Sequence, residues 1–190
     1  TISSADAVAK LITVYSGAVL TISSGATLAV NGSSTHGILN YGTVTNSGVV
    51  NIGSISSSGL YGIRNHGIFN NNTGGQININ RTNLRGILIL AGTFTNQATI
   101  NIGSTHTIGA YGIYTMGTFN NNTGGMINID RSFGFGVYCD TGGSFDNNAS
   151  LIIGAISPIS NLVSGVGVFN NNTGAVLKGT GSISAAVYNT

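Results

Sequence analysis

The sequence predicts an all-β protein, a parallel β-helix (β-solenoid) with about 25 residues in each coil. Three observations support this fold class. Similar sequence words recur at a nearly fixed distance, each repeat contains three short strand-like runs, and one asparagine recurs at the same place in six successive repeats. A fixed period of this length is typical of repeat architectures rather than of a single globular core.

An apolar residue marks the same point of every repeat. The word FNNNTGG occurs at 69–75 and 119–125, and FNNNTG occurs at 169–174. The apolar markers are Val19, Val44, Phe69, Phe94, Phe119, Phe145 and Phe169. Their numbers differ by 25, 25, 25, 25, 26 and 24. The chain therefore supplies about seven coils, which form one solenoid domain over residues 1–190.

Each repeat holds three short runs in which apolar and small polar residues alternate. One run contains the apolar marker, and another contains INI or a close variant, as at 77–79, 100–102 and 127–129. The remaining run contains an apolar residue after glycine, as at Ile63 and Ile113. Because Gly, Asn, Ser or Thr separates these runs, they predict three short strands per coil. Stacked coils would pair these strands in parallel, about 4.8 Å apart.

An asparagine column is the strictest test of this register. Two residues after the markers stand Asn46, Asn71, Asn96, Asn121, Asn147 and Asn171. A buried amide is costly alone, but in a stacked ladder each amide donates to the next coil and accepts from the previous one. The alternative is that asparagine is favoured here only because it suits turns.

The corners of the coil are predicted to alternate in length. Successive apolar positions are 11 residues apart at 52–63 and 102–113, but only 8 apart at 79–87 and 129–137. A coil that is longer at this corner is shorter at the corner that follows the apolar marker, so the number of residues per coil stays nearly the same. We expect this alternation to relieve crowding between corners one strand spacing apart.

The two ends of the chain carry separate expectations. Residues 3–12 fit a short amphipathic helix that could cap the first coil within residues 1–13, or an irregular first strand. Residues 181–190 alternate apolar and polar residues without a helix or charge cluster. An uncapped coil of this kind invites a further strand, from a continuing chain or from a docked copy.

Composition excludes several classes of function. Charged residues make up 5% of the chain, and the six cations are scattered, so no nucleic-acid footprint is present. No apolar stretch is long enough to suggest membrane insertion. The single Cys139 cannot form an intramolecular disulfide. We expect no cofactor.

Enzymes that use a β-helix provide the main alternative class. Polysaccharide lyases and hydrolases need clustered carboxylates, whereas Asp130, Asp140 and Asp146 fall in different strands and corners. The three histidines occupy unequal phases of the repeat, so they predict no metal site. Ice binding is a second alternative, but the threonine pairs at 43–45 and 93–95 occur only in alternate coils. The sequence therefore favours a protein that is not an enzyme.

Aromatic and arginine residues are the candidates for surface binding. Tyr61 and Tyr111 are 50 residues apart, as are Arg81 and Arg131. Each pair should recur on one face two coils apart, about 10 Å by the strand spacing. Such surfaces favour protein or sugar contacts, although the tyrosines could simply pack over the solenoid wall.

The repeats G-x-[FV]-x-N-N and [IV]-N-I-G-S and the segment GAVLKGTGSISA resemble the β-helical repeat regions of large secreted bacterial adhesins, of the autotransporter-passenger and filamentous-haemagglutinin type. The resemblance covers about residues 14–190. It implies a right-handed coil, consistent with the usual hand of parallel crossovers. It further implies a secreted or cell-surface structural protein, either an adhesin stalk segment or a subunit that stacks end to end into a filament. Its partners would be copies of itself or further repeats, with surface glycans or proteins as ligands.

Overall fold

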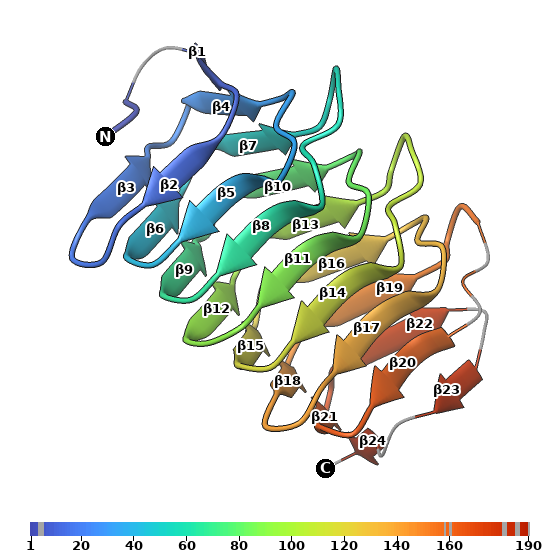
Figure 1. The fold of residues 1–190 in the computed structure, drawn as a ribbon. Coiled ribbons are helices and arrows are strands. Elements are labelled where there is room, and N and C mark those ends of the chain that lie inside the picture. The colour runs from blue at the N-terminus through green and yellow to red at the C-terminus, as the bar shows by residue number, and fades with distance from the viewer. Residues whose placement is uncertain (4–5, 158, 160, 180–181, 185–186, 190) are drawn as a thin grey trace.

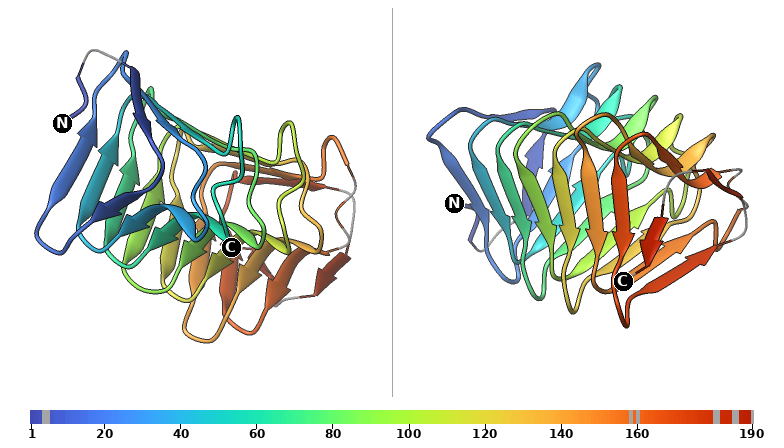
Figure 2. Two further views of the ribbon diagram at one scale, coloured as in Figure 1. Left: turned by 45° about the horizontal axis from the view of Figure 1, so that its top comes forward. Right: turned by 90° about the horizontal axis from the view of Figure 1, so that it is seen from below.

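The computed structural model describes residues 1–3, 6–157, 159, 161–179, 182–184 and 187–189. These residues form a β-solenoid of about seven coils, with three strands in each coil and parallel pairing throughout. Figures 1 and 2 show successive coils lying over one another along one axis, with the N- and C-termini at opposite ends. Among the described residues, none forms a helix that could cross a membrane.

Three sheets of eight strands form the walls of the solenoid. The first sheet contains β1 (Asp6–Ala9), β4 (Thr27–Val30), β7 (Val49–Ile52), β10 (Gln76–Ile79), β13 (Thr99–Ile102), β16 (Met126–Ile129), β19 (Ser150–Ile153) and β22 (Val176–Gly179). The second sheet contains β2 (Ile12–Val14), β5 (His36–Asn40), β8 (Tyr61–Asn65), β11 (Arg85–Ile89), β14 (Tyr111–Thr115), β17 (Phe135–Cys139), β20 (Asn161–Gly165) and β23 (Ser182–Ser184). The third sheet contains β3 (Val19–Ile22), β6 (Thr43–Asn46), β9 (Ile68–Asn71), β12 (Thr93–Asn96), β15 (Thr118–Asn121), β18 (Ser144–Asn147), β21 (Val168–Asn171) and β24 (Val187–Asn189).

The predicted period is confirmed from the second marker onward. In the third sheet, Val44 aligns with Phe69, and Phe69 aligns with Phe94. The marker predicted for the first coil is wrong by one residue, because Leu20 and not Val19 aligns with Val44. Val19 points outward and is 64% exposed.

Of the two alternatives for residues 3–12, the helix is wrong and the strand is confirmed. Residues 4–5 lie outside the described chain, Asp6–Ala9 form β1, and Ile12 begins β2. β1 pairs in parallel with β4, and Ile2 pairs with Ile22. The neighbouring coil offers a full set of backbone donors and acceptors to an extended chain, which outweighs the weak amphipathic helical pattern of so short a segment. The segment therefore adds strands to two sheets instead of plugging the coil.

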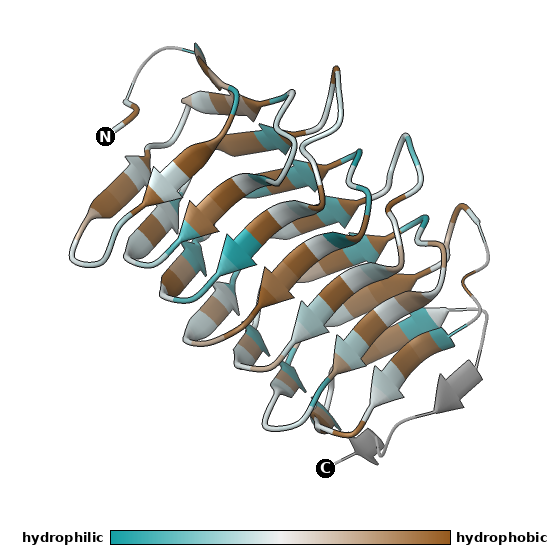
Figure 3. Ribbon diagram, in the orientation of Figure 1, coloured by the Kyte–Doolittle hydropathy of each residue, from teal (hydrophilic) through white to brown (hydrophobic). Residues whose placement is uncertain are grey.

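Columns of identical side chains fill the interior. Five phenylalanines from successive coils of the third sheet are fully buried and stack with ring centroids 4.6, 4.9, 4.7 and 5.2 Å apart. They are Phe69, Phe94, Phe119, Phe145 and Phe169. Isoleucines of the first and second sheets face them, and Figure 3 shows hydrophobic and hydrophilic positions alternating along the strands. The alternation buries one side of each strand and leaves the other to solvent.

A glycine column explains the glycine before the apolar position of the second sheet. A Cβ atom on Gly86 would lie 2.6 Å from the carbonyl oxygen of Gly112 and 2.9 Å from Cγ2 of Ile102. Gly62 and Gly112 are enclosed in the same way by the next coil and by an isoleucine of the first sheet. The isoleucine side chain therefore fits only where the strand opposite it has no side chain.

The corners alternate as predicted. Long loops at 53–60 and 103–110 connect the first sheet to the second, and between them the equivalent loop is only 80–84. The long loops project from the wall in Figure 1. The shorter loop is therefore set back between two projecting neighbours.

Candidate functional site

The predicted asparagine ladder is confirmed and forms the inner spine of the third sheet. The side-chain Nδ2 of each asparagine donates to Oδ1 of the asparagine in the next coil at 2.8 Å, from Asn46 through Asn71, Asn96, Asn121 and Asn147 to Asn171. The members from Asn46 to Asn147 are buried. This column is structural: its amides are occupied by one another and by backbone groups.

A second amide ladder, not recognised as such from the sequence, lies on the outer side of the first sheet. Asn78 donates to Asn51 at 2.8 Å, Asn101 to Asn78 at 2.9 Å, and Asn128 to Asn101 at 2.9 Å. These residues are only partly buried. The recurring INI word contained the signal for this ladder, since its central position must face outward when both isoleucines face inward.

Arg81 and Arg131, predicted as surface-binding candidates, both contact the long loop of the preceding coil. Nη1 of Arg81 donates to the carbonyl oxygens of Gly53 and Ser54, at 3.2 and 2.5 Å. Nη1 of Arg131 donates in the same way to Gly103, at 3.0 Å, and to Ser104. Each guanidinium thus holds the start of the long loop of the preceding coil. These two arginines therefore act as loop clamps, and their role in surface binding stays a prediction.

Tyr61 and Tyr111 do lie on one face, the outer side of the second sheet, with Arg85 between them. Arg85 aligns with Tyr61 in one neighbouring coil and with Tyr111 in the other. We refer to this surface as the aromatic–arginine face; it consists of Tyr61, Arg64, Arg85, Tyr111, Tyr114, Phe135 and Tyr138. Except for the two tyrosines, its members were not predicted, because none of them repeats at a spacing of 50 residues.

The rings of the aromatic–arginine face stack along the solenoid axis. Tyr111 stacks on Phe135 with centroids 5.1 Å apart and planes 11° from parallel, and Tyr114 stacks on Tyr138 at 5.1 Å and 13°. Tyr111 meets Tyr114 edge to face at 5.2 Å. The two stacks therefore form one continuous block of rings over β14 and β17.

Two guanidinium groups flank this block. The central carbon of Arg85 lies 5.7, 5.2 and 4.2 Å from the ring centroids of Tyr61, Tyr111 and Tyr114, and that of Arg64 lies 5.9 Å from Tyr61. Cation–π contact of this kind holds the positive charge in place without neutralising it. Both arginines are partly buried.

One acidic group lies at the edge of the face. The hydroxyl of Tyr114 donates a hydrogen bond to Oδ2 of Asp140, which lowers the pKa of that carboxyl group. Burial, together with the same contact, raises the pKa of Tyr114 to about 12. Tyr114 is thus held protonated at neutral pH and is poorly suited to act as a general base.

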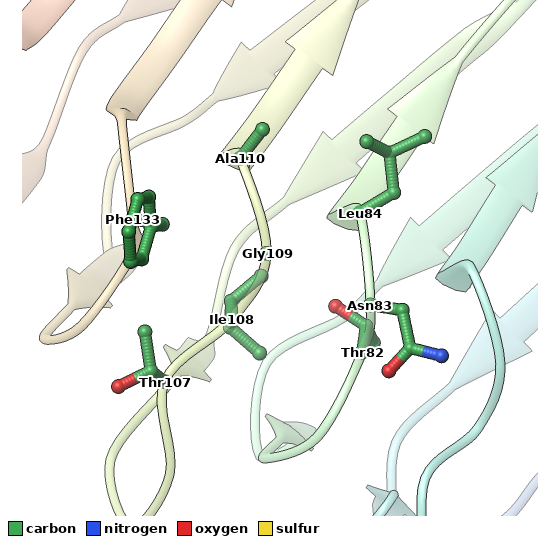
Figure 4. Close-up of a pocket in the computed structure, with 8 residues that line it drawn as sticks. All are labelled: Thr82, Asn83, Leu84, Thr107, Ile108, Gly109, Ala110 and Phe133. Carbon is green, nitrogen blue, oxygen red and sulfur yellow. The ribbon is translucent and has the colours of Figure 1, made fainter.

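A hollow adjoins the start of the aromatic–arginine face. It has a volume of about 450 Å³ and lies beside the set-back loop 80–84. Figure 4 shows Leu84, Ile108 and Phe133 around it, and Leu84 and Ala110 directly precede the first residues of β11 and β14. Phe133 is 86% exposed. The alternation of loop lengths therefore creates a recess at the beginning of these strands.

Two histidines lie beside Arg64. Burial, and secondarily the charge of Arg64, lowers the pKa of His36 and of His66 from the ordinary 6.5. His66 also stacks on Tyr41, with ring centroids 4.7 Å apart. Protonation is therefore disfavoured at both imidazoles in the folded chain.

This environment predicts acid sensitivity. The unfolded chain takes up protons at pH 6.5 before the folded chain does, so stability should be complete above pH 6.5 and should fall as pH drops below it. We expect the thermal midpoint to fall between pH 7.5 and pH 5.5, and to fall less in the His36→Gln/His66→Gln variant, as followed by circular dichroism. An equal fall of the thermal midpoint in the original protein and in the variant would show that His36 and His66 do not cause the acid sensitivity.

Cys139 lies at the end of β17, in the interior of the solenoid. Its side chain is fully buried, and burial, with a smaller effect of Asp146, raises the pKa of the thiol to about 12. Because the thiolate is the reactive form, we expect no labelling by a thiol-specific disulfide reagent in the folded protein and one equivalent in concentrated urea. Rapid labelling without denaturant would show that the solenoid opens locally at β17 and exposes the thiol of Cys139.

The remaining features considered from the sequence are the threonine rows, a metal site and Asp130. In the third sheet the threonine rows are interrupted, as predicted, because Ile68 and Asn70 stand between Thr43–Thr45 and Thr93–Thr95. Within the described ranges, no three His, Cys, Asp or Glu side chains are grouped in a way that could hold a metal ion. Burial raises the pKa of Asp130, which follows β16.

The aromatic–arginine face and the adjoining hollow are therefore the strongest candidate for a functional site. Comparison with family models, with curated proteins and with solved structures finds no match to this chain.

Proposed function

We propose that this chain is a non-catalytic structural protein of the cell surface. In this proposal it is a rigid β-solenoid segment that carries a binding face away from the cell, as an adhesin stalk or as part of a surface filament. The supporting observation is the continuity of the stacked columns: the phenylalanine stack spans five strands of the third sheet and the asparagine ladder spans six.

These columns make the solenoid resistant to bending and stretching. Neighbouring coils are tied by three parallel strand pairs, from Asn46 to Asn171 also by a ladder amide, and from Phe69 to Phe169 also by a stacked ring. Bending or stretching the rod would have to separate several of these contacts at once. A stalk needs this resistance, whereas a catalytic scaffold needs only to position a few residues.

The strands at the two ends of each sheet support the proposed partners. In the described chain β3 also forms a bridge to Ile2, and the other end strands are paired with a named strand on one side only, so their backbone groups can accept another coil. That coil would come from further repeats of the same chain or from a second copy. Secretion is part of the same proposal and is supported by the resemblance to exported adhesin repeats.

Location provides the direct test. Antibodies raised against the purified chain, used for immunogold labelling of the producing cells, should decorate the outer surface. Label confined to the cell interior would overturn the proposal. Negative-stain electron microscopy separates the two versions: discrete short rods at every concentration support the stalk segment, and filaments that lengthen with concentration support the stacking subunit.

A further inference from the structure

The unsatisfied polar atoms of the solenoid gather on the candidate site. Five buried side-chain nitrogen or oxygen atoms in the described chain have no hydrogen-bond partner. Four of them are Nε2 of His36, Nε2 of His66, Nε of Arg64 and Nε of Arg85, on or beside the aromatic–arginine face. The fifth, Oγ1 of Thr82, belongs to the hollow. Because unpaired buried polar atoms are costly, their concentration here marks the face and the hollow as the part of the described solenoid whose polar groups are least satisfied within the chain.

The two positive charges of this surface are only partly balanced within the described chain. Arg64 and Arg85 both lie within 6 Å of the Tyr61 ring centroid, and neither forms an ion pair with a carboxylate in the described structure. The acid within electrostatic reach of Arg85, Asp140, already accepts the hydroxyl of Tyr114. Two arginines from adjacent coils thus present positive charge at one place, in a chain with only six cations. Guanidinium groups bind carboxylate and sulfate oxygens through paired hydrogen bonds.

The orientation of the rings argues against a neutral ligand that stacks on open ring faces. Tyr111 and Phe135 each cover one face of the other, as do Tyr114 and Tyr138, because the stacks run along the axis. Arg85 lies over the rings of Tyr111 and Tyr114. The block therefore presents mainly ring edges and tyrosine hydroxyls to a ligand lying across it. Ring edges carry partial positive charge and hydroxyls donate hydrogen bonds, so both complement oxygen-rich, anionic groups.

The pairing of the strands argues against a peptide that binds as an added strand. β8, β11, β14 and β17 are each paired on both sides, so no free sheet edge lies under the face. A bound polymer must therefore be recognised through its substituents and not through backbone pairing. The face also crosses four coils, a length that suits an extended polymer.

We propose that the aromatic–arginine face binds an acidic polysaccharide. One uronate carboxylate or sulfate group is held by Arg64 and Arg85, and hydroxyl groups of neighbouring sugar units bond to the hydroxyls of Tyr111 and Tyr138. This inference rests on the proposed cell-surface role. It names the class of ligand that the exposed face of the solenoid would bind.

Isothermal titration calorimetry with defined oligomers tests the ligand class. The probes are hexagalacturonate, a sulfated dextran fragment of similar length, neutral cellohexaose and hexaglutamate. Binding of the uronate or the sulfated oligomer, weakened by added NaCl and stronger than that of cellohexaose and hexaglutamate, is the expected result. The two acidic oligomers distinguish carboxylate from sulfate recognition.

Matched variants locate the site. Arg85→Gln and Arg64→Gln should each weaken binding of the acidic oligomer about tenfold or more, since each removes a charged hydrogen-bond donor. Lys178→Gln, the same charge change at an exposed residue of the first sheet, should leave affinity within about twofold. Circular dichroism confirms the fold of each variant. Tyr138→Phe is a third variant: it removes only the hydroxyl that is proposed to bind a sugar unit, and it preserves the ring packing.

Three results would overturn the inference: no binding of either acidic oligomer, equal binding of cellohexaose or hexaglutamate, or equal loss of affinity in Lys178→Gln. None of these would alter the location of the protein on the producing cells, so the proposed function is tested separately. Cleavage of the acidic oligomers in the same incubations, seen as new chain ends, would instead overturn the non-catalytic part of the proposed function.

Discussion

Replacing Asn96 with alanine is expected to lower the free energy of unfolding by about 3 kcal/mol or more, since buried hydrogen-bonding groups left without partners each cost about 1–3 kcal/mol. Asn96 accepts from Asn71 at 2.8 Å and donates to Asn121 at 2.8 Å and to the carbonyl oxygen of Ala98 at 2.9 Å. All three asparagines are buried, so water cannot replace the lost partner. Urea unfolding followed by circular dichroism measures the loss.

The outer ladder provides a matched control in the same coil. Asn101 also donates to one amide and accepts from another, each at 2.9 Å, but it is only partly buried. Because water can satisfy the exposed amides, Asn101→Ala should cost less than about 1 kcal/mol. If the two variants lost equal stability, burial would not be what makes the inner ladder important.

Replacing Phe119 with alanine is expected to cost about 3–5 kcal/mol, the usual range for a fully buried phenylalanine. Its ring stacks between Phe94 and Phe145, at 4.9 and 4.7 Å, so truncation leaves a cavity bounded above and below by other rings. The parallel strand pairs on both sides hold the backbone in place and prevent the coil from collapsing into the gap. Denaturant unfolding again gives the difference.

Phe133 supplies the control for this substitution. It is the same residue type within the same part of the chain, but it is 86% exposed at the rim of the hollow. Phe133→Ala should change the free energy of unfolding by no more than about 0.5 kcal/mol. A loss comparable with that of Phe119→Ala would mean that the exposed ring packs on the solenoid in solution.

Much of the fold could be predicted because a solenoid converts sequence period directly into position. A residue two places after the marker must point inward in every coil once the register is set, so the asparagine ladder followed from spacing alone. The first coil was misjudged by one residue because Leu20 and Val44 are 24 positions apart, not 25. The choice between helix and strand at residues 3–12 stayed open because a local pattern of apolar residues does not show that β4 can pair with this segment.

The candidate site was harder to predict for a related reason. Arg85 lies between Tyr61 and Tyr111, but it is 24 residues from one and 26 from the other, since the corners on its two sides differ in length. The outer positions of the second sheet also change residue type between most neighbouring coils, so no repeated letter marked them in the sequence. Arg81 and Arg131 do repeat, and the reason is structural: each holds a loop that itself occurs in every second coil.

The two amide ladders have opposite polarity. In the inner ladder each asparagine donates toward the following coil, whereas in the outer ladder each donates toward the preceding one. Every carboxamide has an electric dipole, so the two series point in opposing directions along the rod. The side-chain dipoles of the outer ladder therefore offset part of the dipole that the inner ladder alone would build up along the rod as coils are added.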